Sequence, residues 1–478
     1  MSFRQFSRKF KKSFNKNLSR LAFNLQNDTN QRTSWNVLIT GGGGHLAENL
    51  VQKLVENARD ELRPDVVAHL ESQDLHLENQ SGQRTNARVF KKRIELAISR
   101  KMSSHIQIVL LDLLQPNEEL LRNDYTKYIN GSFTDYEIMK DALQNIDTVF
   151  HLAAVGMTGQ YATDRKACMD INAVGTMNLL SWSRQNGVKR FIYSSSIGVV
   201  FNGEPLNNVT EEKEHSENFY NYYCESKAHA EIIVQNASCD ELKTTVLRFN
   251  GIYGPGEKRV TERVVKFMLS GWWIAICEPN GIEAQTQLSS VDNCVQGLVK
   301  AEIALKVKNS KHGEIYNIMD RDPVGTFSFW TPLNQALGFT DHMINIPPWI
   351  LKFGGFFCQN VANFFKVDPF MTSLEVDLLT VNNTFSIEKA CEQIGYDPAP
   401  SSMPEIVEMY GNQQTAEDKL KRKKFFLWRM IFIIFAIISL IIPIVYFSWK
   451  NLIDCYIFLN FYVKFLYKKF HDLYHSQN

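Results

Sequence analysis

The sequence predicts an α/β protein built on a doubly wound parallel sheet, with a smaller C-terminal substrate region and a C-terminal transmembrane helix. A buried-type strand, a glycine turn and a helix follow one another over residues 36–56, an order typical of sheets that bind a ligand at the turn. A stretch of 20 residues without a charge, 430–449, is long enough to cross a bilayer. Short apolar strands recur at 106–112, 127–131, 148–154 and 191–196.

The glycine turn predicts a dinucleotide site. It follows the strand Asn36–Thr40, and its pattern is Gly41-x-x-Gly44-x-x-Ala47. A helix that opens at such a turn can hold a pyrophosphate at its N-terminus, and a small third residue lets the helix pack closely on the strand. We therefore expect Gly41, Gly44 and Ala47 to bind the cofactor.

The acid that would bind the adenosine ribose is Asp112, which ends the strand Ile106–Asp112. A carboxylate there accepts both ribose hydroxyls and repels a 2′-phosphate, which favours NAD over NADP. Asp112 follows Gly41 by about 70 residues, against a usual spacing of about 20, so 58–104 is predicted to be an insertion. In the alternative, 66–70 form the second strand and Glu71 is the acid. Asp112 is preferred because the later strands follow at short spacing only from there.

Tyr223 and Lys227 are the candidate catalytic pair, in the string Tyr-Cys-Glu-Ser-Lys. On a helix they share one face, about one turn apart, and a phenol that acts as a base needs a cation beside it. Ser196 ends the strand 191–196, where a hydroxyl can bind a substrate oxygen. Asn172 precedes a helix and either caps it or holds a water. With the glycine turn, these residues predict hydride transfer between a carbinol and a nicotinamide.

Composition excludes several other classes. The chain has 478 residues, a formal net charge of +1 and 44% hydrophobic residues, which gives no reason to expect a nucleic-acid partner. Its eight cysteines are scattered without a Cys-x-x-Cys pair. We expect reduced thiols, no metal site and no disulfide framework.

Both ends of the chain are predicted to associate with a membrane. Residues 1–35 form a basic segment with an apolar stripe at helical spacing, which suits an amphipathic helix on an anionic membrane surface, a mitochondrial transit peptide or a disordered tail. A basic linker, 412–429, precedes the predicted transmembrane helix 430–449, and 450–478 would be an interfacial tail. The positive linker favours a cytoplasmic catalytic domain. The endoplasmic reticulum is the expected membrane, with a mitochondrial membrane as the alternative.

An ordered set of motifs resembles the extended short-chain dehydrogenase/reductase superfamily, and within it the 3β-hydroxysteroid dehydrogenase/isomerase family. The resemblance covers about 36–410 outside the insertion. It implies that Tyr223 is the general acid/base, that Lys227 holds the nicotinamide ribose and lowers the phenol pKa, and that Ser196 binds the substrate oxygen. The strings that carry it are Thr40–Gly44, Val149–Ala154, Phe191–Ser196, Tyr223-x-x-x-Lys227, Leu247-Arg248, Gly251–Gly256, Ser290–Asn293 and Gly395–Pro398.

The chain departs from the family pattern at four places. Ala47 replaces a glycine, and Ser132 follows Gly131 where the family usually has an Asp that contacts the adenine. Phe249 replaces a proline after Leu247-Arg248. The insertion 58–104 has no identified counterpart.

The region 36–246 is therefore predicted to bind NAD, and 247–411 to bind the substrate. Aromatic stretches in the second region suit a sterol better than a nucleotide sugar, whose diphosphate needs basic residues. An apolar helix face against the membrane would serve as the substrate's entry; its predicted residues are Phe353, Phe356, Phe357, Val361, Phe364 and Phe365.

These features predict a membrane-anchored, NAD-dependent 3β-hydroxysteroid or sterol dehydrogenase of steroid or sterol biosynthesis, with Δ5–Δ4 isomerase activity left open. The expected partners are a lipophilic steroid and membrane lipid, and a homodimer is left open. A nucleotide-sugar epimerase or dehydratase and a non-catalytic dinucleotide-binding scaffold are the alternatives.

Overall fold

The computed structural model describes most of the predicted globular region and little of the chain outside it. The predicted N-terminal segment, the insertion (from 59), the linker (from 413), the transmembrane helix and nearly all of the tail lie outside the described residues. The described residues are 34–58, 105–155, 164–270, 273, 275–277, 282–339, 343–345, 348–365 and 373–412, with 464, 465 and 468.

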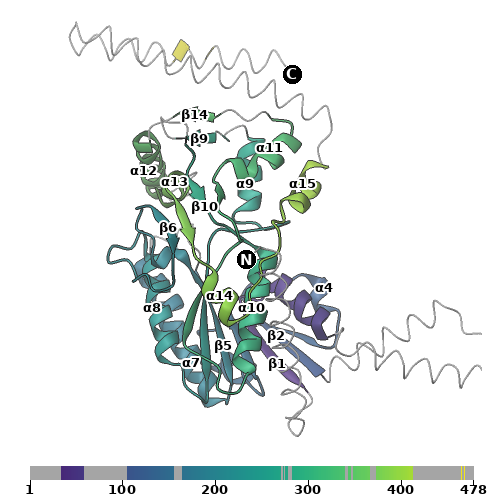
Figure 1. The fold of residues 1–478 in the computed structure, drawn as a ribbon. Helices are drawn as coiled ribbons and strands as arrows, with labels where there is room; N and C mark the ends of the chain where they lie inside the picture. The colour runs from purple at the N-terminus through teal and green to yellow at the C-terminus, as the bar shows by residue number, and fades with distance from the viewer. Residues whose placement is uncertain are drawn as a thin grey trace, which may run out of the picture.

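A seven-stranded parallel sheet forms the larger part of the molecule (Figure 1), which confirms the predicted doubly wound fold. The chain reverses direction across the sheet between β1 and β4, where ligands bind in open α/β sheets. The strand order is β12-β7-β5-β4-β1-β2-β3. The strands are β1 (Trp35–Thr40), β2 (Ile106–Asp112), β3 (Thr126–Asn130), β4 (Thr148–His151), β5 (Arg190–Ser196), β7 (Lys243–Phe249) and β12 (Glu314–Ile318).

Because β1 pairs with β2 on one side and β4 on the other, the strand beside the glycine turn is 106–112. The structure thus favours Asp112 over Glu71 as the acid at this strand end.

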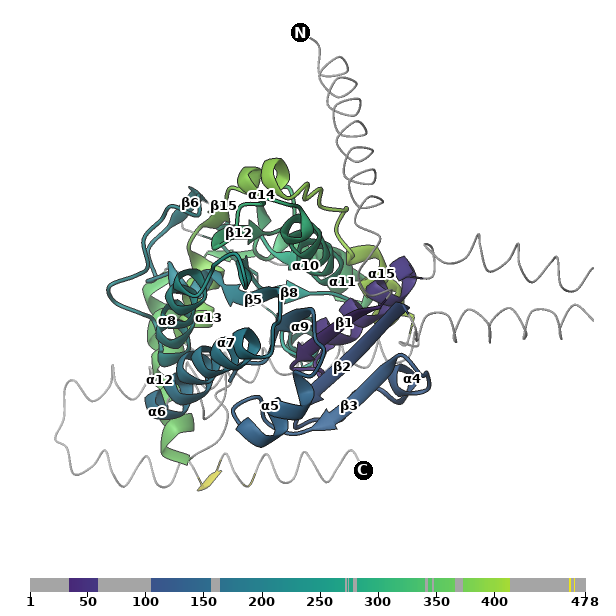
Figure 2. The same ribbon diagram turned by 90° about the horizontal axis from the view of Figure 1, so that it is seen from below.

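Side chains alternate between the two faces of the sheet. Val37 and Ile39 pack with the helix over 45–58 and with α10 (Val291–Lys306), whereas Leu38 packs with the opposite layer. This period of two is what a strand buried on both faces requires. Figure 2 shows α10 and α14 (Glu388–Gln393) on one side of the sheet. The opposite layer contains α5 (Tyr136–Ala142), α6 (Arg165–Cys168), α7 (Thr176–Gln185) and α8 (Tyr222–Asn236).

The C-terminal part lies above the large sheet in Figure 1. It is not continuous in sequence: β7 spans the expected boundary at 246, and α10 and β12 return to the large sheet. Its strands are β6 (Leu206–Val209), β8 (Ile252–Tyr253), β9 (Ala275–Cys277), β10 (Gln285–Thr286), β11 (Ser289–Ser290), β13 (Val324–Gly325), β14 (Met343–Asn345) and β15 (Asn383–Phe385). Its helices are α9 (Thr261–Leu269), α11 (Thr331–Ala336), α12 (Pro348–Phe365), α13 (Ser373–Thr380) and α15 (Met403–Gly411).

The departure at Phe249 has a structural consequence. Phe249 is buried in β7 and lies opposite Ser196 of β5 on one side and Ile318 of β12 on the other. A residue with a backbone N–H can continue a sheet ladder, whereas proline cannot donate to it. Phenylalanine therefore lets β7 stay paired up to its last residue.

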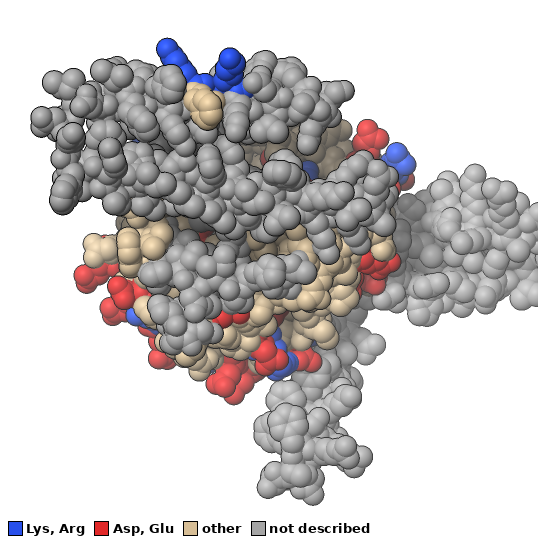
Figure 3. Space-filling model, turned by 90° about the horizontal axis from the view of Figure 1, so that it is seen from above, with Lys and Arg blue, Asp and Glu red and all other residues tan. Residues whose placement is uncertain are grey.

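Helix α12 forms as the aromatic spacing predicts, and part of one face is exposed. Of the predicted apolar face, the side chains of Phe357, Val361, Phe364 and Phe365 lie outside the described residues. The exposed fractions of Trp349, Phe353 and Phe356 are 69%, 68% and 62%. On the face shown in Figure 3, described acidic side chains lie along the left, lower and right margins, and described atoms nearer the middle are mostly uncharged. Every helix in the described part of the chain is too short or too polar to span a membrane.

Candidate active site

The glycine turn is held between the loops that leave β2 and β4. Gly41 has a φ of 77°, and a Cβ there would lie 2.8 Å from the backbone nitrogen of Ala153. At Gly43 a Cβ would lie 2.4 Å from the carbonyl oxygen of Leu114. Larger residues would strain the turn. Gly44 is exposed and directly precedes the helix, and Ala47 is buried against the strand layer, as close helix–strand packing requires.

Asp112 is bound to the same turn. Its Oδ2 accepts a hydrogen bond from the N–H of Gly43, and its Oδ1 accepts one from the N–H of Leu114, both at 3.0 Å. The side chain is only partly buried, and each carboxylate oxygen can accept another hydrogen bond. Its place fits the predicted ribose contact, which stays a prediction.

Tyr223, Lys227 and Ser196 meet at the end of β5. Asn221 caps α8 by accepting from the N–H of Cys224 at 2.9 Å, and this fixes the first turn, which carries Tyr223. The Ser196 side chain acts on the Tyr223 phenol and favours its ionised form. One turn on, Lys227 is 3% exposed; its Nζ donates to the carbonyl of Ser194 and lies 4.3 Å from the centroid of the Tyr193 ring.

In the protein alone, the pKa of the Tyr223 phenol is not lowered as the family resemblance implies, and the pKa of Lys227 is shifted as well. Burial raises the pKa of Tyr223 to about 12, although the charge of Arg259 and the hydrogen bond with Ser196 act to lower it. Burial also lowers the pKa of Lys227 to about 7, against the opposing effect of Glu231. In the protein alone, burial therefore outweighs the effects that lower the phenol pKa, because it disfavours the charged form of both side chains.

Glu231 lies one turn beyond Lys227 on α8, where its carboxylate is buried and pairs with Arg248. Burial alone would raise its pKa, but the guanidinium of Arg248 and the hydrogen bonds from His215 and Arg248 lower it to about 2. The Arg248 Nη2 and the His215 Nε2 both lie 2.8 Å from its Oε2. Glu231 was not predicted from the sequence. The only signal was its i, i+4 spacing from Lys227.

Asn172 caps no helix. It lies in the π-helical segment Met169–Gly175, which continues from α6 into α7, so no helix begins there. Its Oδ1 accepts from the N–H of Val155 at 2.8 Å, and its Nδ2 donates to Ser226 Oγ at 2.9 Å. Asn172 therefore connects the loop after β4 to the helix that carries Tyr223.

Arg259 was not predicted from the sequence either. It is exposed in the loop before α9, and its positive charge acts on the pKa of both Tyr223 and Lys227. Glu257 fixes this loop, because its carboxylate accepts from the N–H groups of Arg259 and Val260 at 2.7 and 2.6 Å. No motif marks Arg259, since the chain brings it to α8 only by folding.

The departure at Ser132 places a hydroxyl at the end of β3. Ser132 Oγ lies 2.7 Å from Thr134 Oγ1, and the nearby Asp135 is engaged in capping α5.

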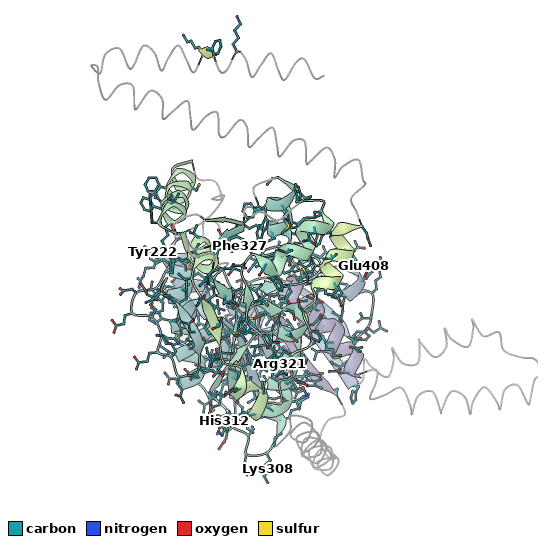
Figure 4. The ribbon with its side chains drawn as sticks, turned by 45° about the horizontal axis from the view of Figure 1, so that its top comes forward. Tyr222, Lys308, His312, Arg321, Phe327 and Glu408 are labelled. Carbon is teal, nitrogen blue, oxygen red and sulfur yellow. The ribbon has the colours of Figure 1, made fainter. Side chains whose placement is uncertain are left out.

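Figure 4 shows Tyr222 toward the end of the molecule that carries Phe327 of the C-terminal part, and His312 and Lys308 toward the opposite end. The start of α8 thus lies on the side of the C-terminal part.

Comparisons with known proteins agree with this arrangement. Residues 38–347 match the model of the 3-beta hydroxysteroid dehydrogenase/isomerase family. The chain is 59% identical over 376 residues to 3beta-hydroxysteroid dehydrogenase/Delta(5)-Delta(4) isomerase 1 of Caenorhabditis elegans, covering 79% of each chain. It is 29% identical over 323 residues to human short-chain dehydrogenase/reductase family 42E member 1, covering 64% of this chain and 81% of the relative.

Solved structures share the fold at lower identity. UDP-glucuronic acid 4-epimerase from Bacillus cereus, in complex with NAD, is 18% identical with a TM-score of 0.52. The match covers 80% of this chain and all of that one. A dTDP-glucose 4,6-dehydratase from Streptomyces venezuelae is 16% identical with a TM-score of 0.54, covering 79% and 97%. At these identities the likeness concerns the fold.

Proposed function

Since the chain belongs to the 3-beta hydroxysteroid dehydrogenase/isomerase family and is thus an oxidoreductase-type enzyme, we propose that it oxidises the 3β-hydroxyl of a steroid or sterol to a ketone with NAD. The observation that carries the proposal is the meeting of Ser196, Tyr223 and Lys227 at the end of β5. A Δ5–Δ4 isomerisation after the oxidation is part of the proposal, as is a role in steroid or sterol biosynthesis.

The residues around the glycine turn fit a dinucleotide. The turn has no side chain to obstruct a pyrophosphate, and close backbone contacts at Gly41 and Gly43 explain why larger residues are disfavoured there. The helix over 45–58 presents its N-terminus to the same space, and its dipole favours a bound anion. Gly41, Gly44 and Ala47 would hold the pyrophosphate, Asp112 the adenosine ribose and Lys227 the nicotinamide ribose. When bound, NAD supplies the hydride acceptor.

Two side chains, Ser196 and Tyr223, would act on the substrate hydroxyl. Ser196 donates a hydrogen bond to the substrate oxygen and keeps its carbon facing the cofactor. Tyr223, as the phenolate, takes the hydroxyl proton. With a pKa of about 12, the phenol is mostly protonated at neutral pH, so the positive nicotinamide and Arg259 are the cations that favour the phenolate. Such acid–base assistance contributes about 10²–10⁴-fold to a rate.

A lipid surface is the proposed route of the substrate. Trp349, Phe353 and Phe356 present exposed apolar area on α12, and large exposed aromatic groups suit insertion among lipid headgroups. The predicted transmembrane helix 430–449 would keep this face at a membrane, with the catalytic domain on the cytoplasmic side. A homodimer stays an untested prediction.

The substrate assignment is tested with the full-length protein in detergent, given NAD and a 3β-hydroxy-Δ5-steroid. We expect formation of NADH, and absorbance of a conjugated enone if isomerisation follows. The 3α-hydroxy epimer is the matched control and should react far more slowly. Turnover of a nucleotide sugar in place of the steroid would favour the epimerase alternative. Tight NAD binding without oxidation of any alcohol would favour the scaffold.

The lipid route is tested with Phe353→Glu/Phe356→Glu. We expect a higher KM for a sterol supplied in phospholipid vesicles and an unchanged KM for the same sterol in detergent micelles. Ile303→Glu, an exposed position on α10, is the control. An equal KM for vesicle sterol in all three proteins would rule out this role for α12.

A further inference from the structure

A chain of buried hydrogen bonds runs beneath the candidate active site. It begins at Thr40, the residue before the glycine turn, whose Oγ1 lies 2.6 Å from His151 Nδ1. The other ring nitrogen, Nε2, lies 2.9 Å from Thr176 Oγ1. All three side chains are at most 1% exposed. His151 therefore joins the end of β1 to the start of α7.

The direction of each bond follows from the groups at the two ends. Thr176 donates its hydroxyl proton to the carbonyl oxygen of Asn172 at 2.6 Å, so its oxygen must accept the proton on His151 Nε2. His151 Nδ1 then lacks a proton and accepts from the Thr40 hydroxyl, while the Thr40 oxygen accepts from the N–H of Ala153. Burial and the charge of Lys227 lower the pKa of His151 to about 3, in agreement with a neutral ring that has one donor and one acceptor.

The chain continues through Asn172 to the catalytic helix. The Asn172 side chain donates to Ser226 Oγ at 2.9 Å, and the Ser226 hydroxyl donates to the carbonyl oxygen of Tyr223 at 2.8 Å. A connected buried network favours one arrangement of its members, because breaking any link leaves an unsatisfied polar group. The backbone of Tyr223 is thereby tied to Thr40.

We propose that His151 and Thr176 are positioning residues that couple cofactor binding at the glycine turn to the placement of Tyr223. Dinucleotide contact with residues 41–44 restrains Thr40. The hydrogen bonds through His151, Thr176, Asn172 and Ser226 then restrain the start of α8, which carries Tyr223. By reciprocity, loosening α8 through this chain weakens cofactor binding. The inference rests on the proposed function only for its use of NAD as the ligand.

The test compares Thr176→Val, which keeps the shape and removes the hydroxyl, with Thr176→Ser, which keeps the hydroxyl. Thr244→Val is the matched control. Thr244 is equally buried and donates to the carbonyl of Val234 at 2.8 Å, and it takes no part in the hydrogen-bond chain from Thr40 to Tyr223. The Kd for NAD is measured by calorimetry on full-length protein in detergent, with Tm as the measure of folding. Loss of one hydrogen bond should raise the Kd of Thr176→Val about three- to tenfold. His151→Phe, which removes both bonds, should raise it further.

Thr176→Ser and Thr244→Val should bind NAD within about twofold of wild type, although both lower Tm. With an active substrate, Thr176→Val should also lower kcat and increase the isotope effect of a deuterated carbinol. An unchanged Kd in folded Thr176→Val, or an equal rise in Thr176→Ser or Thr244→Val, overturns the coupling. If the wild type binds NAD but oxidises no steroid, the proposed substrate is wrong. The Kd values of the Thr176 and Thr244 variants for NAD still test the coupling. A wild type that binds no NAD would overturn both.

Discussion

Tyr223, Lys227 and Glu231 follow one another at intervals of one turn on α8, and Glu231 pairs with Arg248 of β7. The pair Glu231–Arg248 and the pair Tyr223–Lys227 differ in how their surroundings shift the pKa values. Glu231 and Arg248 are both almost fully buried and paired with each other, and the pKa of Glu231 falls to about 2. Lys227 is buried and Tyr223 is partly buried, but both are shifted toward their neutral forms. The first pair is satisfied within the protein. Shifted pKa values of the second kind are common among groups that act on a ligand.

Removing the Tyr223 hydroxyl should have the largest effect. Tyr223→Phe keeps the ring and its packing, so we expect kcat for steroid oxidation to fall about 10²–10⁴-fold. Initial NADH formation measures this, and the Kd for NAD should change little. A variant with more than a tenth of wild-type kcat would mean that another group moves the proton, and the contrast between the two pairs would lose its functional meaning.

Breaking the satisfied pair should damage stability. Glu231→Gln leaves the buried Arg248 without a counter-charge, and breaking a buried pair typically costs about 3–5 kcal/mol. The matched control on the same helix is Glu225→Gln, whose partner Arg165 is largely exposed, and such pairs contribute about 0–1 kcal/mol. Urea unfolding measures both. Equal losses in the two variants would show that Glu231–Arg248 is not specially important.

The lowered pKa of Lys227 should make the stability of the folded protein depend on pH. Its folded pKa is about 7, below the ordinary value of 10.5, so the unfolded chain binds more protons between these values. Its contribution to stability is therefore most unfavourable below about pH 7 and fades as the pH rises to 10.5. Lys227→Met should abolish this part of the rise in Tm between pH 7 and 10. A wild type and variant with parallel Tm curves would contradict the lowered pKa.

Arg259 should have the smallest effect, and a specific one. Its charge lowers the pKa of Tyr223, so Arg259→Gln should move the alkaline rise of kcat/KM for steroid oxidation to higher pH. Arg259→Lys, which keeps the charge, should restore the wild-type profile. Full pH profiles of the three proteins decide this. A uniform loss of activity without displacement along the pH axis would instead indicate a role in substrate binding.

The sequence was most informative where a residue's role follows from its neighbours in the chain. Gly41 and Gly44, Asp112 at the end of β2, Ser196 at the end of β5 and the Tyr223–Lys227 spacing all lie where local patterns placed them. Asn172 was misjudged because a π segment that runs on from α6 cannot be recognised from spacing alone. Arg259 carried no signal, since its effect depends on a loop brought to α8 from a different part of the chain.

The sequence by itself located strands β1 to β5 along the chain and the chemical groups at their ends, because apolar runs and turn residues act over a few neighbouring positions. Only the tertiary structure decided how those groups are charged. Burial raised the pKa of Tyr223 and lowered that of Lys227, while Arg248 of β7 kept Glu231 of α8 ionised. The tertiary structure also brought together the hydrogen-bond chain from Thr40 through His151 to Ser226. The physical reason is that solvation and charge pairing depend on distances between residues far apart in the chain, which spacing along the sequence does not record.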